Sequence, residues 1–389
     1  MRRQVLLRWQ ASPLFGWGIV GLNLLQCWAS DPDVQPLLGS SIAQRHLPSM
    51  DPLRLNAIWH AALASNDFFE QLEAGGVDLQ QRGVVVIEGL GNGLTPPARR
   101  LTGVRTLGRC IFENTHIKST QQLAPYDALL CASHWAADVL RSLSDKPVAL
   151  IHEGIDPSLF FPGPRSGLLD RDRFYVFSGG KIEFRKAQDL VILAFREFAA
   201  RHPDAVLVAM WDSPWSQAGF QGKLDAPVRR AANGTFDIQG WVAENGVPLH
   251  QFIGLGPTPN HLIPFVLREM DCAVQVSRCE ACTNLPAKEA MACGVPVILA
   301  NNTGTRDLID ADNCVALNSQ GPVAGPPGVG TDGWGETSVD ELVAALETLY
   351  TDAQLRKRIA ARGAAWILEH RRTWTEHAAA LKSYLLGLF

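Results

Sequence analysis

The chain has 389 residues, of which 47% are hydrophobic, 8% aromatic and 19% charged, and its 35 Lys and Arg against 39 Asp and Glu give a net charge of −4. This composition excludes a disordered or fibrous chain. Because the chain has no excess of positive charge, nucleic acid is not expected as a partner. At roughly 150 residues per domain, the length predicts two or three domains.

The N-terminal segment is expected to form a strand over residues 4–9, a glycine-containing loop over 12–18 and a helix over 19–29. Its long uncharged stretch superficially resembles a signal peptide or a membrane anchor. However, Arg8 and several prolines and glycines break it up, whereas a spanning helix needs about 20 predominantly apolar residues. The eight cysteines are scattered, which favours a reducing, cytoplasmic location. A peripheral position at the inner face of a membrane is compatible with it.

Short apolar runs alternate with amphipathic segments through most of the chain. A helix is predicted over 188–201, where apolar residues recur at helical spacing. Continuous apolar strands that alternate with helices predict an α/β fold with parallel, doubly wound sheets. The expected strands contain the runs at 84–87, 128–131, 148–151, 174–177, 205–209, 272–276 and 295–299.

The alternation occurs twice, on either side of a polar, proline-rich break at 156–164. We therefore expect a first Rossmann-like domain over 1–163, a second over 164–372 and a C-terminal helical segment over 373–389. A Gly- and Pro-rich loop at 322–334 precedes the helical end of the chain. Ligands of such sheets bind at the carboxyl ends of strands, and two facing sheets place their pocket in the cleft between them.

A basic loop follows the predicted strand at 174–177. Gly180 permits close backbone approach, and Lys181, Arg185 and Lys186 follow it. Cations in such a loop can hold a phosphate. A solvated surface loop is the alternative, but the position after a strand and a glycine pair favours phosphate binding.

A second motif spans 277–298 and carries two carboxylates, Glu280 and Glu289. A short helix is predicted over 286–293, ending at Gly294. Its N-terminus and the preceding loop form a ready site for an anion or a hydroxyl group. Glu289 lies in an apolar helix, and a buried carboxylate needs a partner such as a ligand hydroxyl.

With these motifs the chain resembles GT-B glycosyltransferases of the family-4 type, which use nucleotide-sugar donors. The resemblance runs from about 180 to 309. Gly180-Lys181 and Lys186-Ala187 match the phosphate motif, and Glu280 with the run from Glu289 through Cys293-Gly294 to Val297 matches the Glu…Glu-Ala-Met-Ala-Cys-Gly-x-Pro-Val motif. Two departures are a nine-residue spacing of the glutamates instead of eight, and Lys181 in place of the usual arginine.

The resemblance implies two domains facing across a cleft, and a C-terminal helix that packs back on the first domain. It also implies transfer from a UDP- or GDP-sugar with retention of configuration, no metal ion and no cofactor. The acceptor would be a glycan, a lipid, a protein or a small molecule. The implied catalytic residues are Lys186, Glu280 and Lys181, and the implied donor-binding residues are Gly16, Gly18, Gly180, Lys181, Arg185, Lys186, Thr283, Asn284, Leu285 and Glu289.

The N-terminal half matches the family more loosely. Gly16 and Gly18 follow the first strand, where a plain turn is an equal alternative to a donor-phosphate loop. Glu113 and His116 are acceptor-side candidates, with a surface role as the alternative. His134 opens a helix next to a capping serine and is interpreted as structural.

Three other functions remain open at this stage. One is a sugar-nucleotide epimerase of the same fold, another is a phosphorylase, and the third is an inactive donor-binding scaffold subunit. A zinc site is not predicted, because Cys279 and Cys282 form a Cys-x-x-Cys pair without a second pair of ligands.

Overall fold

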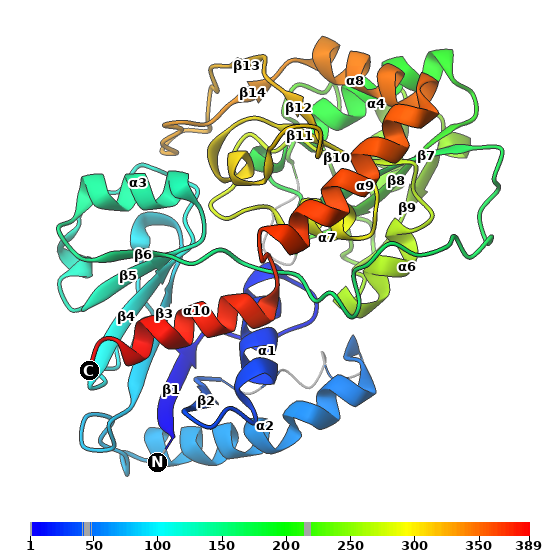
Figure 1. Ribbon diagram of the computed structural model, residues 1–389. Helices are drawn as coiled ribbons and strands as arrows, with labels where there is room; N and C mark the ends of the chain where they lie inside the picture. Colours follow the sequence, from blue (N-terminus) through cyan, green and yellow to red (C-terminus); the bar gives the residue numbers. More distant parts are fainter. Residues whose placement is uncertain (1, 41, 43–46, 48, 214–218) are drawn as a thin grey trace.

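Two six-stranded parallel sheets organise the chain (Figure 1). The structure is a computed structural model that describes residues 2–40, 42, 47, 49–213 and 219–389. In the first sheet the strand order is β2-β1-β3-β4-β5-β6, and every neighbouring pair is parallel. Its elements are β1 Arg3–Arg8, α1 Gly16–Trp28, β2 Val34–Leu38, α2 Pro52–Glu73, β3 Val85–Leu90, β4 Arg105–Cys110, β5 Ala128–Cys131, α3 His134–Leu143 and β6 Val148–Leu150.

The second sheet has the order β12-β11-β10-β7-β8-β9 and is also parallel throughout. Its central strands are apolar and buried on both faces, because helices cover each side. Its elements are β7 Phe174–Gly180, α4 Gln188–Arg201, β8 Ala205–Trp211, α5 Ile238–Glu244, β9 Phe252–Gly254, α6 Ile263–Leu267, β10 Cys272–Gln275, α7 Leu285–Ala292, β11 Val297–Ala300, β12 Val315–Leu317, the antiparallel pair β13 Gln320–Gly321 and β14 Glu336–Thr337, α8 Val339–Thr351 and α9 Ala353–Glu369.

The expected fold class is confirmed: the molecule consists of two Rossmann-like units of the GT-B type. One boundary was wrong. The first helix begins at Gly16 rather than at residue 19, so both glycines of the expected loop lie inside α1. Gly18 is needed there for packing, because a Cβ at this position would lie 2.5 Å from the Cβ of Ser12.

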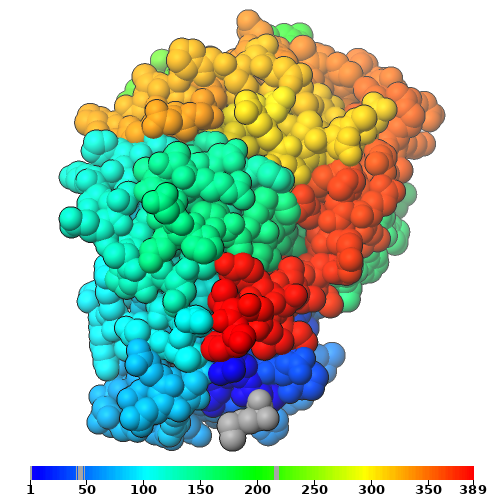
Figure 2. All heavy atoms as spheres, turned by 60° about the vertical axis from the view of Figure 1, so that its left-hand side comes forward, coloured from blue at the N-terminus to red at the C-terminus, as the bar shows by residue number. Residues whose placement is uncertain are grey.

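The last helix, α10 Trp374–Leu386, returns to the first domain and lies against α1. Trp374, Leu381 and Leu385 are buried in the same apolar cluster as β1, and the indole of Trp28 donates a 3.3 Å hydrogen bond to the carbonyl of Ala378. Figure 2 shows this segment, in red, against the blue and cyan surfaces of the first domain. Among the described residues, no helix combines the length and the apolarity that crossing a bilayer requires.

Candidate active site

The basic loop after β7 is shaped by two unusual backbone conformations. Gly180, the last residue of β7, has a φ of 140°, which L side chains rarely adopt. A single 3₁₀ turn, Phe184–Lys186, follows, and Ala187 then enters the left-handed region with a φ of 57° before α4 begins. These turns bring Arg185 and Lys186 to the loop that follows β10.

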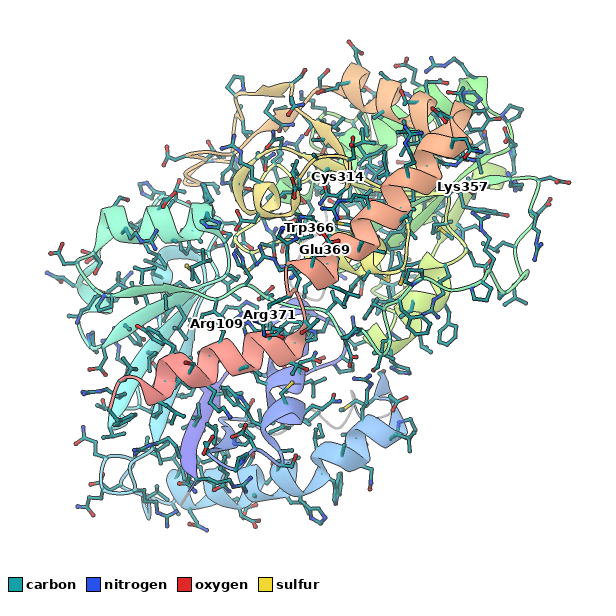
Figure 3. All side chains as sticks on the ribbon, viewed as in Figure 1. Arg109, Cys314, Lys357, Trp366, Glu369 and Arg371 are labelled. Carbon is teal, nitrogen blue, oxygen red and sulfur yellow. The ribbon has the colours of Figure 1, made fainter. Side chains whose placement is uncertain are left out.

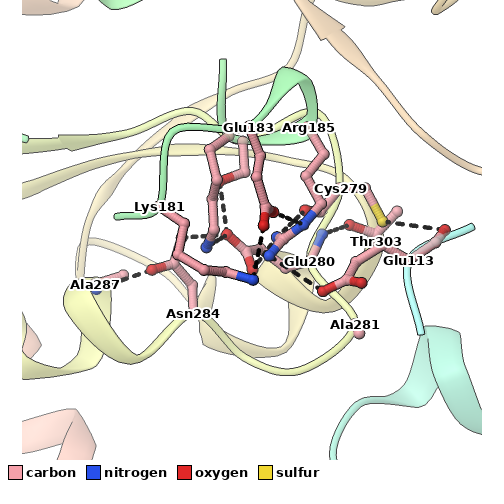
Figure 4. Close-up of polar contacts among 12 residues, drawn as sticks. Glu113, Lys181, Glu183, Arg185, Cys279, Glu280, Ala281, Asn284, Ala287 and Thr303 are labelled. Carbon is pink, nitrogen blue, oxygen red and sulfur yellow. Dashed lines mark hydrogen bonds and ion pairs between the residues drawn. The ribbon is translucent and has the colours of Figure 1, made fainter. Parts of the chain in front are cut away.

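Glu280 lies at the centre of a buried cluster of charges (Figure 4). Nζ of Lys186 lies 2.6 Å from one carboxylate oxygen, and a guanidinium nitrogen of Arg185 lies 3.3 Å from the other. The Ser277 hydroxyl and the Asn284 side-chain amide donate further hydrogen bonds of 2.6 and 3.1 Å to the first oxygen. The nine-residue spacing therefore still brings Glu280 onto the phosphate-motif cations.

Charge pairing outweighs burial for the carboxylates of this cluster. Burial by itself raises the pKa of Glu280, but Lys186 and Arg185 hold it below its usual value. Glu183 lies 2.8 Å from both Lys181 and Arg185, and its pKa falls to about 2 because these cations overcome burial. Both carboxylates are thus ionised at neutral pH. Burial does lower the pKa of Lys186, although Glu280 opposes this shift.

Arg185 connects the two domains. Its guanidinium lies 3.1 Å from Glu113, which follows β4 of the first domain, as well as near Glu183 and Glu280. The indole of Trp334, from the Gly- and Pro-rich loop, donates to the Glu113 carbonyl at 3.0 Å. Figure 4 shows Glu113 reaching this cluster from the cyan segment. His116, by contrast, is exposed.

Glu289 lies on α7 and is 4% exposed. The side-chain amide of Asn260 donates a 2.6 Å hydrogen bond to its carboxylate, and the backbone N–H of Asn260 donates to the Pro13 carbonyl of the first domain at 3.1 Å. Burial raises the pKa of Glu289 to about 7, against the opposing effects of Asn260 and Lys288. This carboxyl therefore has a weaker set of partners than Glu280.

The remaining expected donor-binding residues lie around the N-terminus of α7. Asn284, with a φ of 51°, caps the helix by accepting from the Ala287 N–H at 3.2 Å. The Thr283 hydroxyl is buried without a hydrogen-bond partner. Leu285 faces α1, because a Cβ on Gly16 would lie 3.7 Å from its side chain. Gly18 is turned toward Ser12 instead.

A family comparison now identifies this arrangement. The model of the family described as glycosyl transferases group 1 matches residues 164–366, just over half of the chain. The chain belongs to this family.

Relatives of this chain are distant in sequence. A GDP-mannose-dependent alpha-(1-6)-phosphatidylinositol monomannoside mannosyltransferase from Mycolicibacterium smegmatis is 24% identical over 270 residues, which are 67% of this chain and 62% of that protein. The match thus spans less than two thirds of the relative.

Two solved structures share the fold over the whole length. Sucrose-phosphate synthase from Thermosynechococcus elongatus has a TM-score of 0.68 at 16% identity, covering 100% of this chain and 99% of that chain. HepE from Anabaena in complex with UDP has a TM-score of 0.64 at 15% identity, covering 99% and 100%.

Three polar residues of the candidate site were not among the expected ones. Glu183 and Ser277 lie inside the two motif segments. Their polar side chains next to the expected site residues could have indicated them. Asn260 had no local signal, because only the folded chain brings it to Glu289, 29 positions further on.

An open groove of about 300 Å³ lies at the carboxyl ends of β1 and β3 in the first domain. Three of its seven lining residues are aromatic, and the rings of Trp9 and Trp17 lie 5.8 Å apart at an angle of 59°. A Cβ on Gly89 would lie 2.8 Å from the Trp17 ring, so only glycine leaves room for this indole. The groove is lined by Arg8, Trp9, Gln10, Phe15, Trp17, Gly89 and Gly91.

Proposed function

We propose that the protein is a glycosyltransferase that moves a sugar from a UDP- or GDP-sugar to its acceptor with retention of configuration, in the site around Glu280 and without a metal ion. The observation that carries the proposal is the buried contact of Lys186 and Arg185 with Glu280. Two cations held this close can bind the diphosphate of the donor and stabilise the charge that develops when the glycosidic bond breaks.

The charges of the cluster support this role. Arg185 contacts three carboxylates, and a diphosphate supplies the same type of acceptor oxygens to a guanidinium. Lys181 lies beside Glu183 at the edge of the cluster, where it can contact the outer phosphate. The relative that uses GDP-mannose and the HepE complex with UDP support a nucleoside diphosphate sugar as donor.

Glu289 is proposed to hold the ribose hydroxyls. Its single described side-chain hydrogen-bond donor is Asn260, so further donors can be accommodated on a carboxylate, which offers about four lone-pair sites. The buried, unpaired hydroxyl of Thr283 and the N-terminus of α7 are further groups for the diphosphate.

The test is turnover by Lys186→Ala, assayed in EDTA with UDP- and GDP-sugars. We expect turnover to fall about 100-fold, because a positive charge at the leaving diphosphate is lost. Donor affinity should fall less, since the effect is largest in the transition state. Lys357→Ala, on the exposed face of α9 (Figure 3), is the matched control. Unchanged turnover in Lys186→Ala, or activity that needs Mn²⁺ or Mg²⁺, would contradict the proposal.

The acceptor is proposed to bind in the aromatic groove of the first domain. Carboxyl ends of parallel strands are the usual ligand side, and indole rings offer flat apolar faces to a sugar ring. Trp17→Ala should raise the KM for octyl glycoside acceptors and leave donor hydrolysis unchanged, whereas Trp59→Ala, on exposed α2, should change neither. Contact of the protein with a membrane surface stays a prediction from the sequence.

A further inference from the structure

Three metal-ligating side chains converge where the two domains meet. His134 is the first residue of α3, His152 follows β6, and Asp307 lies in the 3₁₀ helix Thr303–Leu308 of the second domain. One ligand atom from each lies within 4.8 Å of the other two. Nδ1 of His134 is 3.1 Å and Nδ1 of His152 is 3.7 Å from the same oxygen of Asp307.

We propose that His134, His152 and Asp307 form a binding site for one Zn²⁺ ion that joins the two domains. Zinc takes imidazole nitrogens and carboxylate oxygens at about 2.0–2.2 Å, and tetrahedral ligands at such distances lie roughly 3.4 Å from each other. The observed separations need only small side-chain movements to reach this geometry. The His134 side chain is 67% exposed, so water can occupy the fourth position.

The surroundings hold the ligands in place. The carboxylate of Asp307 is 6% exposed and also accepts from the backbone N–H of His134 at 2.9 Å, which fixes it at the start of α3. The rings of His134 and His152 lie 5.4 Å apart, close enough to face one ion. Such outer contacts orient ligands in metal sites.

Two contacts compete with the metal. Nδ1 of His152 lies 3.0 Å from the carbonyl of Ala132, so metal binding at this nitrogen replaces a hydrogen bond. Arg372 is half-buried, and its positive charge, which Asp307 attracts, opposes a second cation. Removing the charge of Arg372 should therefore increase the affinity for zinc, whereas substitutions of the ligands should decrease it.

The experiment is a Co²⁺ titration of the metal-free full chain, followed by displacement with Zn²⁺. We expect the visible d–d absorption of tetrahedral cobalt, saturating at one ion per chain and abolished by Zn²⁺. His134→Ala and Asp307→Asn should each weaken binding at least tenfold, and Arg372→Gln should strengthen it several-fold. His250→Ala, an exposed histidine elsewhere in the second domain, should have no effect.

Three outcomes would overturn the proposal. One is equal binding by His134→Ala and the wild type. Another is the intense near-ultraviolet band of a cobalt–thiolate bond, which would assign the ion to one of the eight free cysteines. The third is binding unaffected by Asp307→Asn in a variant whose circular dichroism is native. None of these readouts depends on glycosyl transfer, so failure of the proposed function leaves this test intact.

Discussion

Glu289 and Glu280 lie in one loop–helix segment, yet their surroundings favour opposite protonation states. Glu280 has two cations within 3.3 Å and stays charged, whereas the Glu289 carboxylate accepts a hydrogen bond from the neutral side-chain amide of Asn260. Charging Glu289 in the folded protein is therefore costly. The ribose hydroxyls of the donor are the ligand groups that we propose for this carboxylate.

Glu289→Gln should consequently stabilise the free protein while weakening donor binding. Because the folded pKa of Glu289 is raised from 4.5 to about 7, the folded state binds more protons than the unfolded state between these values, and wild-type stability falls as pH rises through them. The glutamine variant lacks this loss, so at about pH 8 it should be more stable by up to about 3 kcal/mol.

Urea unfolding at about pH 5 and about pH 8 measures this difference, with nucleotide titrations alongside. UDP or GDP should bind about ten- to a hundredfold more weakly to Glu289→Gln, because hydrogen bonds to a charged acceptor contribute about 1.5–3 kcal/mol. Normal nucleotide affinity combined with lower stability would identify Glu289 as a core group instead.

At this scale the sequence predicted which charged side chains are candidates for the site, but not all of the residues that they contact. Lys186, Arg185 and Glu280 were identified because each lies in a motif next to a strand end. The contact of Arg185 with Glu113 was not predicted, since it depends on how the two domains are arranged. The cluster of His134, His152 and Asp307 was missed for the same reason, because its members are up to 173 positions apart.

Among the elements, α10 belongs in sequence to the end of the second domain but contributes to the core of the first. Leu381 and Leu385 are 1% and 0% exposed within the cluster around β1, whereas Leu386 is 39% exposed. Leu381→Ala should lower the free energy of unfolding by about 2–5 kcal/mol, the usual cost of a cavity in a core. Leu386→Ala should change it by less than about 0.5 kcal/mol. Equal effects in urea unfolding would mean that α10 is not tightly docked.

Most strands buried on both faces were predictable, whereas among the four edge strands of the two sheets only β6 was expected, from the apolar run at 148–151. The runs in β7, β8 and β10 are continuously apolar, since helices cover both faces of the sheet. β2 was not predicted from the sequence, because Pro36 interrupts its apolar run. In the structure β2 lies at the edge of its sheet, where a proline is tolerated. Like β6, the edge strands β9 and β12 have three residues each, and neither was assigned from the sequence.

For the whole molecule, the decisive feature is that the chain passes between the domains twice at one place. Ile155 donates to the carbonyl of Arg372 at 2.9 Å, and Trp374 donates back to Ile155 at 3.0 Å. Figure 3 shows Arg371 in the short segment after α9 at this crossing. Nζ of Lys288, from the helix that carries Glu289, donates to the Glu153 carbonyl at 2.8 Å. The helix of the proposed donor site, α7, is thereby connected to the segment at which the chain crosses between the domains.

Gly154 determines how closely the two crossing segments approach. A Cβ at this position would lie 2.1 Å from the carbonyl carbon of Thr373 and 2.4 Å from the nitrogen of Trp374. Both are backbone atoms, which cannot rotate away as a side chain can. Gly154→Ala must therefore separate the two segments and break the hydrogen bonds between Ile155 and its partners.

We expect Gly154→Ala to change the angle between the domains while each keeps its own sheet. Turnover should fall at least tenfold, because Glu113 of the first domain no longer meets Arg185 of the second. UDP or GDP affinity should change little, since the proposed nucleotide contacts lie in the second domain. Small-angle X-ray scattering should show a larger radius of gyration than in Gly76→Ala, a control whose new Cβ has its nearest neighbour at 3.5 Å. Unchanged scattering and turnover in Gly154→Ala would mean that the crossing can widen without moving the domains, and that the site does not depend on it.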